Sequence, residues 1–369
     1  MCGLSRPRSD VSPAWWLGGP NCAVEYTSRA AARAGPRSRT KDGPQMNSPA
    51  LSIVALSYNR LADIQANLPV LATWVKANAS ELIVVDNNSS DGSASFIETV
   101  ASEHPELTAV LNKTNRGVAG GRNDGMARTS GAIVLFLDDD SAPETRFLDE
   151  LPALFQAYPE AGLITPRIIQ TSTGNYENGH GDEPCWVGNF HGSCYAVQRS
   201  VIDSIGGFDE GCTFGGEELD YSIRAHDVGM KCLYHPDYTS HHNSIVRTGK
   251  QTDFGRLEKW FYNYGRVLAK NFPDGMALRL THNYSRSNAM RLAAKGQHKA
   301  ARVVLQSAQK GFRVGQAESK KVKSATAEFY NSAALRPEFG NVSVATKLLE
   351  KLKIRPAPKP LVVERRELS

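Results

Sequence analysis

Three consecutive carboxylates, Asp138, Asp139 and Asp140, come directly after the apolar run AIVLFL. Acids that are packed together at the end of a buried strand repel one another, which raises the cost of ionising them. A divalent cation removes this cost, and Mg²⁺ commonly takes one or two protein carboxylates together with substrate phosphates. The pattern therefore favours a site for Mg²⁺ or Mn²⁺ that receives a phosphorylated substrate. The alternative is an acidic first turn of a helix that begins near Glu144.

A second acidic group contains Glu217, Glu218 and Asp220, ahead of a predicted helix. One of these carboxylates is suited to act as a general base that deprotonates a hydroxyl group. The alternative is that all three stabilise the positive N-terminus of the helix. The pair His241 and His242 follows a strand-like segment, and neutral imidazole is a common metal ligand.

Two further polar segments follow predicted strands. In the first, Asp86 stands at a strand end, where it is free to accept a hydrogen bond from a base or a ribose, while Asp91 or Ser93 caps the next helix. In the second, glycines permit close backbone approach and Arg122 lies near a predicted helix start, where it could pair with phosphate. This second segment lacks the Gly-Lys-Ser/Thr of a Walker loop.

Strands that alternate with helices must position these residues. Short apolar runs rich in β-branched residues predict strands, and the stretches between them predict helices of 10–15 residues, which is typical of parallel βαβ units. Ligands bind such sheets beyond the carboxyl ends of the strands, where the polar segments lie. We expect strands at 51–56, 81–85, 108–111, 132–137, 162–169, 188–197 and 231–235, with helices at 61–78, 93–102, 120–129, 199–205 and 217–227.

Composition divides the chain into four parts. Residues 1–48, rich in Arg, Ala, Gly, Pro and Ser, are predicted to be disordered, with Met46 as an alternative start. An α/β domain is expected over 49–250, a helical C-terminal extension over 251–350 and a tail over 351–369. We find neither an apolar run of about 18 residues nor a signal peptide, and the six cysteines form no CxxC pair, so we expect a cytoplasmic protein.

Positive charge is concentrated away from the α/β domain. The formal net charge is +5, of which residues 1–46 contribute +4, so global charge does not argue for nucleic acid. Residues 279–323 contain eleven Lys/Arg and one acid, and the spacing of Arg291, Lys295, Lys299 and Arg302 predicts one shared helix face. That face is either solvated or a peripheral contact to anionic lipid at the inner face of the cell membrane.

Taken together, residues 50–245 resemble the family 2 glycosyltransferases, which have the GT-A fold: a mixed, mostly parallel sheet flanked by helices. Gly121-Arg122-Asn123 is similar to a Gly-Arg-Asn segment of that family, and Asp86 to the acid that reads the base. The resemblance implies that Asp138 lies near the ribose and that Asp140, in an Asp-x-Asp motif, binds the metal that bridges the two phosphates. It implies nucleotide contacts for Ser57, Tyr58, Asn59, Arg60, Asp86, Asn88, Gly121, Arg122, Asn123, Asp138 and Asp139.

The same resemblance also implies which residues bind the acceptor and act on its hydroxyl group. Residues 194–210 are similar to the family's acceptor segment, and Glu217-Glu218 corresponds to a Glu-Asp pair whose second acid is the expected base. Because this chain has Glu218 at that position, Glu217 and Asp220 remain rivals. The family's late metal-binding histidine corresponds to His242, counted from Pro236, with His241 as the alternative.

The expected function is that of a metal-dependent, inverting glycosyltransferase that resembles rhamnosyltransferases. It would transfer a sugar from a dTDP- or UDP-sugar to a hydroxyl of a carbohydrate or lipid-linked acceptor, in cell-surface glycan or glycolipid synthesis. A sugar-phosphate nucleotidyltransferase is the first alternative, although SYNR stands where its Gly-rich basic signature is expected. A nucleotide-sugar-binding protein without catalysis is the second. Nucleic acid is not an expected partner, because aromatic residues are sparse in the basic stretch.

Overall fold

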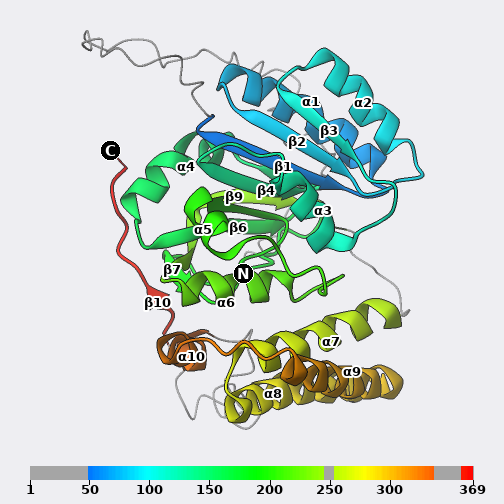
Figure 1. The fold of residues 1–369 in the computed structure, drawn as a ribbon, viewed down its shortest axis with the longest axis vertical. Coiled ribbons are helices and arrows are strands. Elements are labelled where there is room, and N and C mark those ends of the chain that lie inside the picture. Colours follow the sequence, from blue (N-terminus) through cyan, green and yellow to red (C-terminus); the bar gives the residue numbers. More distant parts are fainter. Residues whose placement is uncertain (1–48, 245–252, 336–358, 369) are drawn as a thin grey trace, which may run out of the picture. The chain divides into compact units, whose positions relative to one another are not determined.

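The computed structural model describes residues 49–244, 253–335 and 359–368 and contains a ten-stranded mixed sheet flanked by helices (Figure 1). The strand order is β10-β7-β9-β6-β8-β4-β1-β2-β3, and β5 pairs with β9 outside this path. The segment 1–48, which we predicted to be disordered, and the alternative start Met46 lie outside the described residues.

The first half of the sheet is parallel, as the alternation of strands and helices predicted. It contains β1 (Leu51–Ser57), α1 (Leu61–Ala77), β2 (Glu81–Asp86), α2 (Ser93–Glu103), β3 (Leu107–Leu111), α3 (Gly117–Met126) and β4 (Ile133–Asp138). Ser57 pairs with Asp86, and Leu56 pairs with Asp138. This register brings the carboxyl ends of β1, β2 and β4 to one edge, which is where ligands of such sheets bind.

Both faces of this half are covered, which explains why every residue of β1 is buried. Ile53 and Ala55 belong to a core on the face that α1 and α4 cover. Val54 and Leu56, the alternate residues, belong to a core on the face that α3, α5 and α6 cover. The continuous apolar run of the strand therefore reflects burial on two sides.

The second half contains antiparallel strands. Its elements are β5 (Ser141–Pro143), α4 (Thr145–Ala157), β6 (Ala161–Gln170), β7 (Cys185–Val187), β8 (Cys194–Gln198), α5 (Arg199–Ile205), α6 (Glu217–Asp227) and β9 (Lys231–His242). Strand β8 runs antiparallel between β4 and β6, and Leu137 pairs with Cys194. The loop before β8 therefore lies at the same edge as the end of β4. Our predicted strand at 188–197 is wrong in its first part, because residues 188–193 form this loop.

Strand β9 is longer than the predicted 231–235. It continues through an irregularity opposite Pro166 and Arg167 and ends at His242, so the histidine pair lies within the strand and not beyond it. His242 pairs with Gln170 of β6 and with Ser141 of β5. The sequence does not reveal this extension, because Pro236 cannot donate a ladder hydrogen bond and a proline argues against a central strand.

The C-terminal extension is helical, as predicted, up to residue 335. It contains α7 (Phe254–Asn271), α8 (Asp274–Ala294), α9 (His298–Ala317), α10 (Ser324–Asn331) and the 3-10 turn η1 (Ala333–Leu335). Our prediction that Arg291, Lys295, Lys299 and Arg302 share one helix face is wrong. Gly296, with a φ of 75°, separates α8 from α9, so these residues lie on both sides of a turn. No helix in the described ranges has the length and apolarity that crossing a bilayer requires.

Part of the predicted tail pairs with the sheet. Strand β10 (Leu361–Val362) runs antiparallel to β7, and Arg365 forms ion pairs with Glu183 and Asp237. Residues 336–358, between η1 and this segment, lie outside the described residues.

The backbones of helices α7 and α9 pack in close contact, which two glycines of α9 make possible. A Cβ at Gly311 would overlap the carbonyl oxygen of Tyr262, and one at Gly315 would overlap that of Arg266. We expect Gly311→Ala to force the two helices apart and to lower the free energy of unfolding by about 1–3 kcal/mol. Urea unfolding of the full chain, followed by circular dichroism, measures this loss.

Gly275→Ala is the matched control for this prediction, because Gly275 lies in α8 and a Cβ there meets nothing within 4 Å. Alanine has the higher helix propensity, so the free energy of unfolding should stay the same or rise by up to about 1 kcal/mol. Equal losses in the two variants would contradict the packing argument.

Candidate active site

A cleft of about 1110 Å³ lies beyond the carboxyl ends of β1 and β4. Seven of the residues that we predicted for the site line it: Tyr58, Asn59, Arg60, Asp138, Asp139, Asp140 and His242. They come from the ends of three strands, β1, β4 and β9, which the sheet register brings together.

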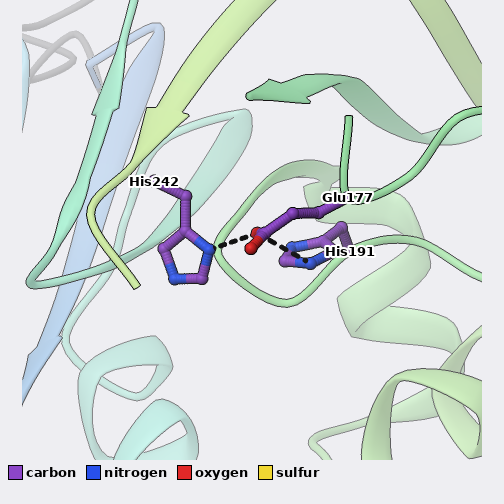
Figure 2. A group of neighbouring side chains, drawn as sticks. All are labelled: Glu177, His191 and His242. Carbon is purple, nitrogen blue, oxygen red and sulfur yellow. Dashed lines mark hydrogen bonds and ion pairs between the residues drawn. The ribbon is translucent and has the colours of Figure 1, made fainter. Parts of the chain in front are cut away.

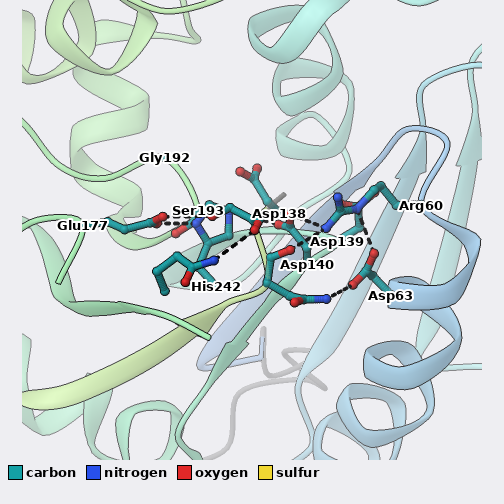
Figure 3. Close-up of polar contacts among 12 residues, drawn as sticks. Arg60, Asp63, Asp138, Asp139, Asp140, Glu177, Gly192, Ser193 and His242 are labelled. Carbon is teal, nitrogen blue, oxygen red and sulfur yellow. Dashed lines mark hydrogen bonds and ion pairs between the residues drawn. The ribbon is translucent and has the colours of Figure 1, made fainter. Parts of the chain in front are cut away.

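Asp138, Asp140 and His242 form a group whose ligand atoms lie within 4.8 Å of one another. Asp140 lies between His242 and Arg60: its Oδ1 is 3.2 Å from Nε2 of His242, and its Oδ2 is 2.6 Å from Nη2 of Arg60 (Figure 3). Although burial opposes the charged form, hydrogen bonding to His242 and the charges of His242 and Arg60 hold the pKa of Asp140 below its usual value. Burial likewise opposes the charged form of His242, but its bonds to Asp140 and Glu177 raise its pKa to about 10.

This donor set fits a divalent cation. Two carboxylates and one imidazole, gathered at the wall of a cleft, offer the oxygen ligands that Mg²⁺ and Mn²⁺ prefer and one nitrogen ligand. His241 is the adjacent residue of β9, and successive side chains of a strand point to opposite faces. The contact with Asp140 is made by His242.

Asp139, the middle carboxylate, supports the loop that leaves β1. Its Oδ2 accepts the backbone N–H of Tyr58 at 3.0 Å, and its carbonyl oxygen accepts the amide of Asn67 at 2.8 Å. Burial and the neighbouring charge of Asp140 raise the pKa of Asp139 to about 8. Asp139 therefore shapes the wall of the cleft through the chain after β1.

Asp86, at the end of β2, has one free oxygen. Its Oδ2 accepts the backbone N–H of Ser89 at 2.9 Å, whereas the buried Oδ1 has no hydrogen-bond partner among the described residues. Leaving a buried acceptor without a partner is costly, which marks this oxygen as a candidate acceptor for a ligand donor, but Asp86 is not among the residues that line the cleft. Nearby Asn88 is exposed and has a φ of 68°. Asp91 accepts the backbone N–H groups of Leu61 and Ser93.

Arg122 lies in the second turn of α3, because that helix begins at Gly117 and not near Gly120 as we predicted. Its side chain is 2% exposed, and the guanidinium lies between Asp138 and Glu218. Nη2 is 3.1 Å from Oδ1 of Asp138 and 2.7 Å from the carbonyl oxygen of Gly192, and Nη1 is 3.2 Å from Oε1 of Glu218. Arg122 therefore contacts carboxylates in the structure, and the phosphate contact that the sequence indicated for it stays a prediction.

The neighbours of Arg122 serve packing. A Cβ at Gly121 would lie 2.5 Å from Cδ1 of Leu56, so α3 packs closely against β1. The side chain of Asn123 donates to the carbonyl oxygen of Phe208 and accepts its N–H, at 3.0 and 2.7 Å. Asn123 therefore fixes the segment after α5, which we assigned to the acceptor side.

The three acids predicted as bases differ in their surroundings. Glu218 is 15% exposed, whereas Glu217 is buried, and burial and the charge of Glu218 raise the pKa of Glu217. Asp220 is fully buried and accepts from Arg224, Lys270 and Asn271 at 2.7, 3.0 and 3.2 Å. These bonds join α6 to α7, which favours a packing role for Asp220.

Several residues at the site were not predicted. Glu177, in the polar loop after β6, contacts His242, and Arg256 and Lys259 of α7 line the cleft. The sequence offered one indication that Glu177 belongs to the site, namely that its polar loop directly follows a strand. No local pattern connects α7 with strands that precede it by more than 100 residues.

Comparison with known proteins identifies the family and the fold. Residues 52–218 match the sequence profile of the family described as Glycosyl transferase family 2. The chain is 23% identical over 233 residues to glycosyltransferase AglE of Haloferax volcanii, with 59% of this chain and 72% of AglE covered. It is 22% identical over 208 residues to the probable glycosyltransferase YdaM of Bacillus subtilis, but covers only 49% of that protein.

The solved structure of GalNAc-T7 with UDP, GalNAc and Mn²⁺ is similar in fold, with a TM-score of 0.52 and 15% identity over 74% of this chain and 57% of that one. At this identity the likeness concerns the fold alone. Through residues 52–218, the chain belongs to glycosyltransferase family 2, and its fold is GT-A.

Proposed function

We propose that this protein transfers a sugar from a dTDP- or UDP-sugar to an acceptor hydroxyl, with inversion, in the synthesis of a cell-surface glycan or glycolipid. The observation that carries the proposal is the group Asp138, Asp140 and His242 at the wall of a large cleft. Glu218 is connected to this group through Arg122, which contacts both Glu218 and Asp138. A base and a metal-binding group in one site are the parts that such a transfer requires.

In the proposed reaction, Glu218 accepts the proton of the acceptor hydroxyl, whose oxygen attacks the anomeric carbon from the side opposite the leaving group. Arg122 holds Glu218 by its Oε1 and so fixes the position of the carboxylate. A divalent cation held by Asp140 and His242, with Asp138, would stabilise the negative charge of the departing diphosphate as a Lewis acid. Arg60 fixes Asp140 from the other side.

We assign recognition of the base to Asp86, whose buried Oδ1 has no hydrogen-bond partner among the described residues. Cationic side chains from two segments line the cleft: Arg116, before α3, and Arg256 and Lys259 of α7. They provide positive charge for a diphosphate without taking part in the metal group. The test of this part of the proposal compares nucleotides.

We expect one of UDP, dTDP and GDP to bind the full chain in the presence of Mn²⁺ or Mg²⁺ and to lose affinity when a chelator is added. Asp140→Asn keeps the size of the side chain but removes its charge, so it should weaken metal-dependent binding by about 10-fold or more, equivalent to about 1.4 kcal/mol. Isothermal titration calorimetry measures both effects.

Asp203→Asn is the control for this prediction, because Asp203 is an exposed acid of α5 outside the cleft. It should bind nucleotide as the unaltered protein does. The metal part of the proposal is rejected if nucleotide affinity does not fall when a chelator is added, or if the Asp140→Asn protein binds nucleotide with unchanged affinity.

Glu218→Gln should lower kcat by about 10²–10⁴-fold, because the amide cannot accept the proton. Nucleotide affinity should stay the same, since the amide oxygen still accepts from Arg122. The readout is transfer or slow donor hydrolysis, with the sugar nucleotide that calorimetry selects.

Asp220→Asn tests whether Asp220, and not Glu218, is the general base. Because Lys270 and Arg224 lose a charged partner, this variant should unfold at lower temperature while its kcat stays near that of the unaltered protein at low temperature. A large loss of kcat in Asp220→Asn, with none in Glu218→Gln, would reverse the assignment. A protein that binds nucleotide but shows neither transfer nor hydrolysis would favour the non-catalytic alternative.

We also propose that the C-terminal helices contact anionic lipid from the cytoplasmic side. All eleven basic residues of 279–323 are exposed, and apolar side chains are exposed among them at Leu278, Met290 and Leu305. Each basic residue near an anionic surface contributes about 1 kcal/mol, and apolar side chains add to this attraction. A lipid-linked acceptor would suit this arrangement.

Flotation with vesicles tests this contact. The full chain should float with vesicles that contain anionic lipid and remain behind with neutral phosphatidylcholine vesicles, and added salt should weaken the binding. Charge reversal at Arg286, Arg302 and Lys310 together should abolish flotation, whereas Lys76→Glu, on exposed α1 surface, should not. Flotation that does not depend on anionic lipid would remove the proposal.

A further inference from the structure

A second polar group, Glu177, His191 and His242, adjoins the proposed metal site and shares His242 with it (Figure 2). Oε2 of Glu177 is 2.5 Å from Nδ1 of His242 and 3.5 Å from Nε2 of His191. Oε1 of Glu177 accepts from the hydroxyl of Ser244 at 2.9 Å. The carboxylate of Glu177 thus has neighbours on both oxygens.

The loop that carries Glu177 is fixed to the sheet edge. Gln170, the last residue of β6, pairs with His242, and the N–H of Thr171 donates to the carbonyl oxygen of His242 at 3.0 Å. The loop then returns: the N–H of Glu177 donates to the carbonyl oxygen of Ile168 at 3.0 Å. The buried side chain of Asn178 accepts the N–H of Ile168 and donates to the carbonyl oxygen of Pro166, at 2.7 and 2.8 Å. Glu177 is therefore held beside His242 by backbone hydrogen bonds and by the side chain of Asn178.

The two ring nitrogens of His242 face different carboxylates. Nδ1 faces Glu177 at 2.5 Å, and Nε2 faces Asp140 at 3.2 Å. A carboxylate beside one ring nitrogen keeps a proton on that nitrogen, which leaves the other nitrogen to bind a metal. Metal-binding histidines commonly have such an outer carboxylate, and its loss costs about 10–100-fold in metal affinity.

Of the two groups, the one with Asp138 and Asp140 is better placed to hold a cation. Asp138, Asp140 and His242 line the cleft, whereas Glu177 and His191 are not among its lining residues. His191 is already engaged through Nδ1, 2.9 Å from the hydroxyl of Ser193, and burial lowers its pKa to about 4.

We propose that Glu177 is a positioning residue, which accepts the Nδ1 proton of His242 and thereby directs Nε2 toward Asp140 as a metal ligand. This inference rests on the proposed function, because it assumes a cation at Asp140 and His242. It assigns a role to the loop after β6 that the similarity to the family does not supply.

The test is the affinity of the full chain for Mn²⁺ alone, measured from the electron paramagnetic resonance signal of free Mn²⁺. Glu177→Ala should weaken Mn²⁺ binding by about 10–100-fold. Glu177→Gln should lose less, because its amide oxygen still accepts from Nδ1, and this partial rescue depends on hydrogen bonding and not on charge. Melting temperatures of the variants, measured alongside, establish that each is folded.

Two controls separate this role from the alternatives. Glu183→Ala removes an acid from the same loop that pairs with Arg365, and it should leave Mn²⁺ affinity unchanged. His191→Gln should also have little effect, whereas Asp140→Asn should reduce Mn²⁺ binding strongly. Loss of binding in His191→Gln with none in Asp140→Asn would place the cation in the second group and overturn the proposal.

The remaining outcomes distinguish a failure of the proposed metal site from a failure of the proposed role of Glu177. If the unaltered protein binds no Mn²⁺, the metal part of the proposed function fails, and the role of Glu177 fails with it. If the unaltered protein and Glu177→Ala bind Mn²⁺ equally while Asp140→Asn does not bind it, only the role of Glu177 is overturned.

Discussion

The gathering of carboxylates at one sheet edge is the constraint on which the site depends. Strand register brings Asp86 and Asp138 to the ends of β2 and β4, the two strands that flank β1, and Asp139 and Asp140 follow Asp138 directly. Like charges at such distances cannot all ionise without counter-charges. Arg60, Arg122 and His242 each contact one of the acids at the end of β4, so the charge is divided among fixed partners.

Arg122 connects the two chemical parts of the site. One guanidinium contacts Asp138 on the proposed metal side and Glu218 on the proposed acceptor side, and its planar fork allows both contacts at once. At 2% exposure, Arg122 would leave buried charges unpaired if it were removed. The position of Arg122 in turn depends on the close approach of α3 to β1 at Gly121. Local packing of a helix on a strand thus sets the distance between base and metal group.

The sequence predicted the parts of this fold that local pattern controls. Runs such as 51–56 identified parallel strands, and the ends of those strands led directly to Asp86 and Asp138–140. The extension of β9 was not predictable, because its pairing partners in β5 and β6 lie far away in sequence. The contact of Glu177 with His242 joins residues 65 positions apart, which no periodicity encodes. The false helix face across Gly296 shows that charge spacing alone does not establish a continuous helix.

The structure also gives a physical reason why Glu218 can occupy a position at which the family resemblance led us to expect aspartate. Glutamate is longer by one methylene, so its carboxylate needs additional room. Gly192, in the loop before β8, provides that room, because a Cβ there would overlap Oε1 of Glu218. The carbonyl oxygen of Gly192 also accepts from Arg122 at 2.7 Å, which fixes the loop beside the carboxylate. The absence of a side chain at Gly192 therefore leaves the space that the carboxylate of the longer acid occupies.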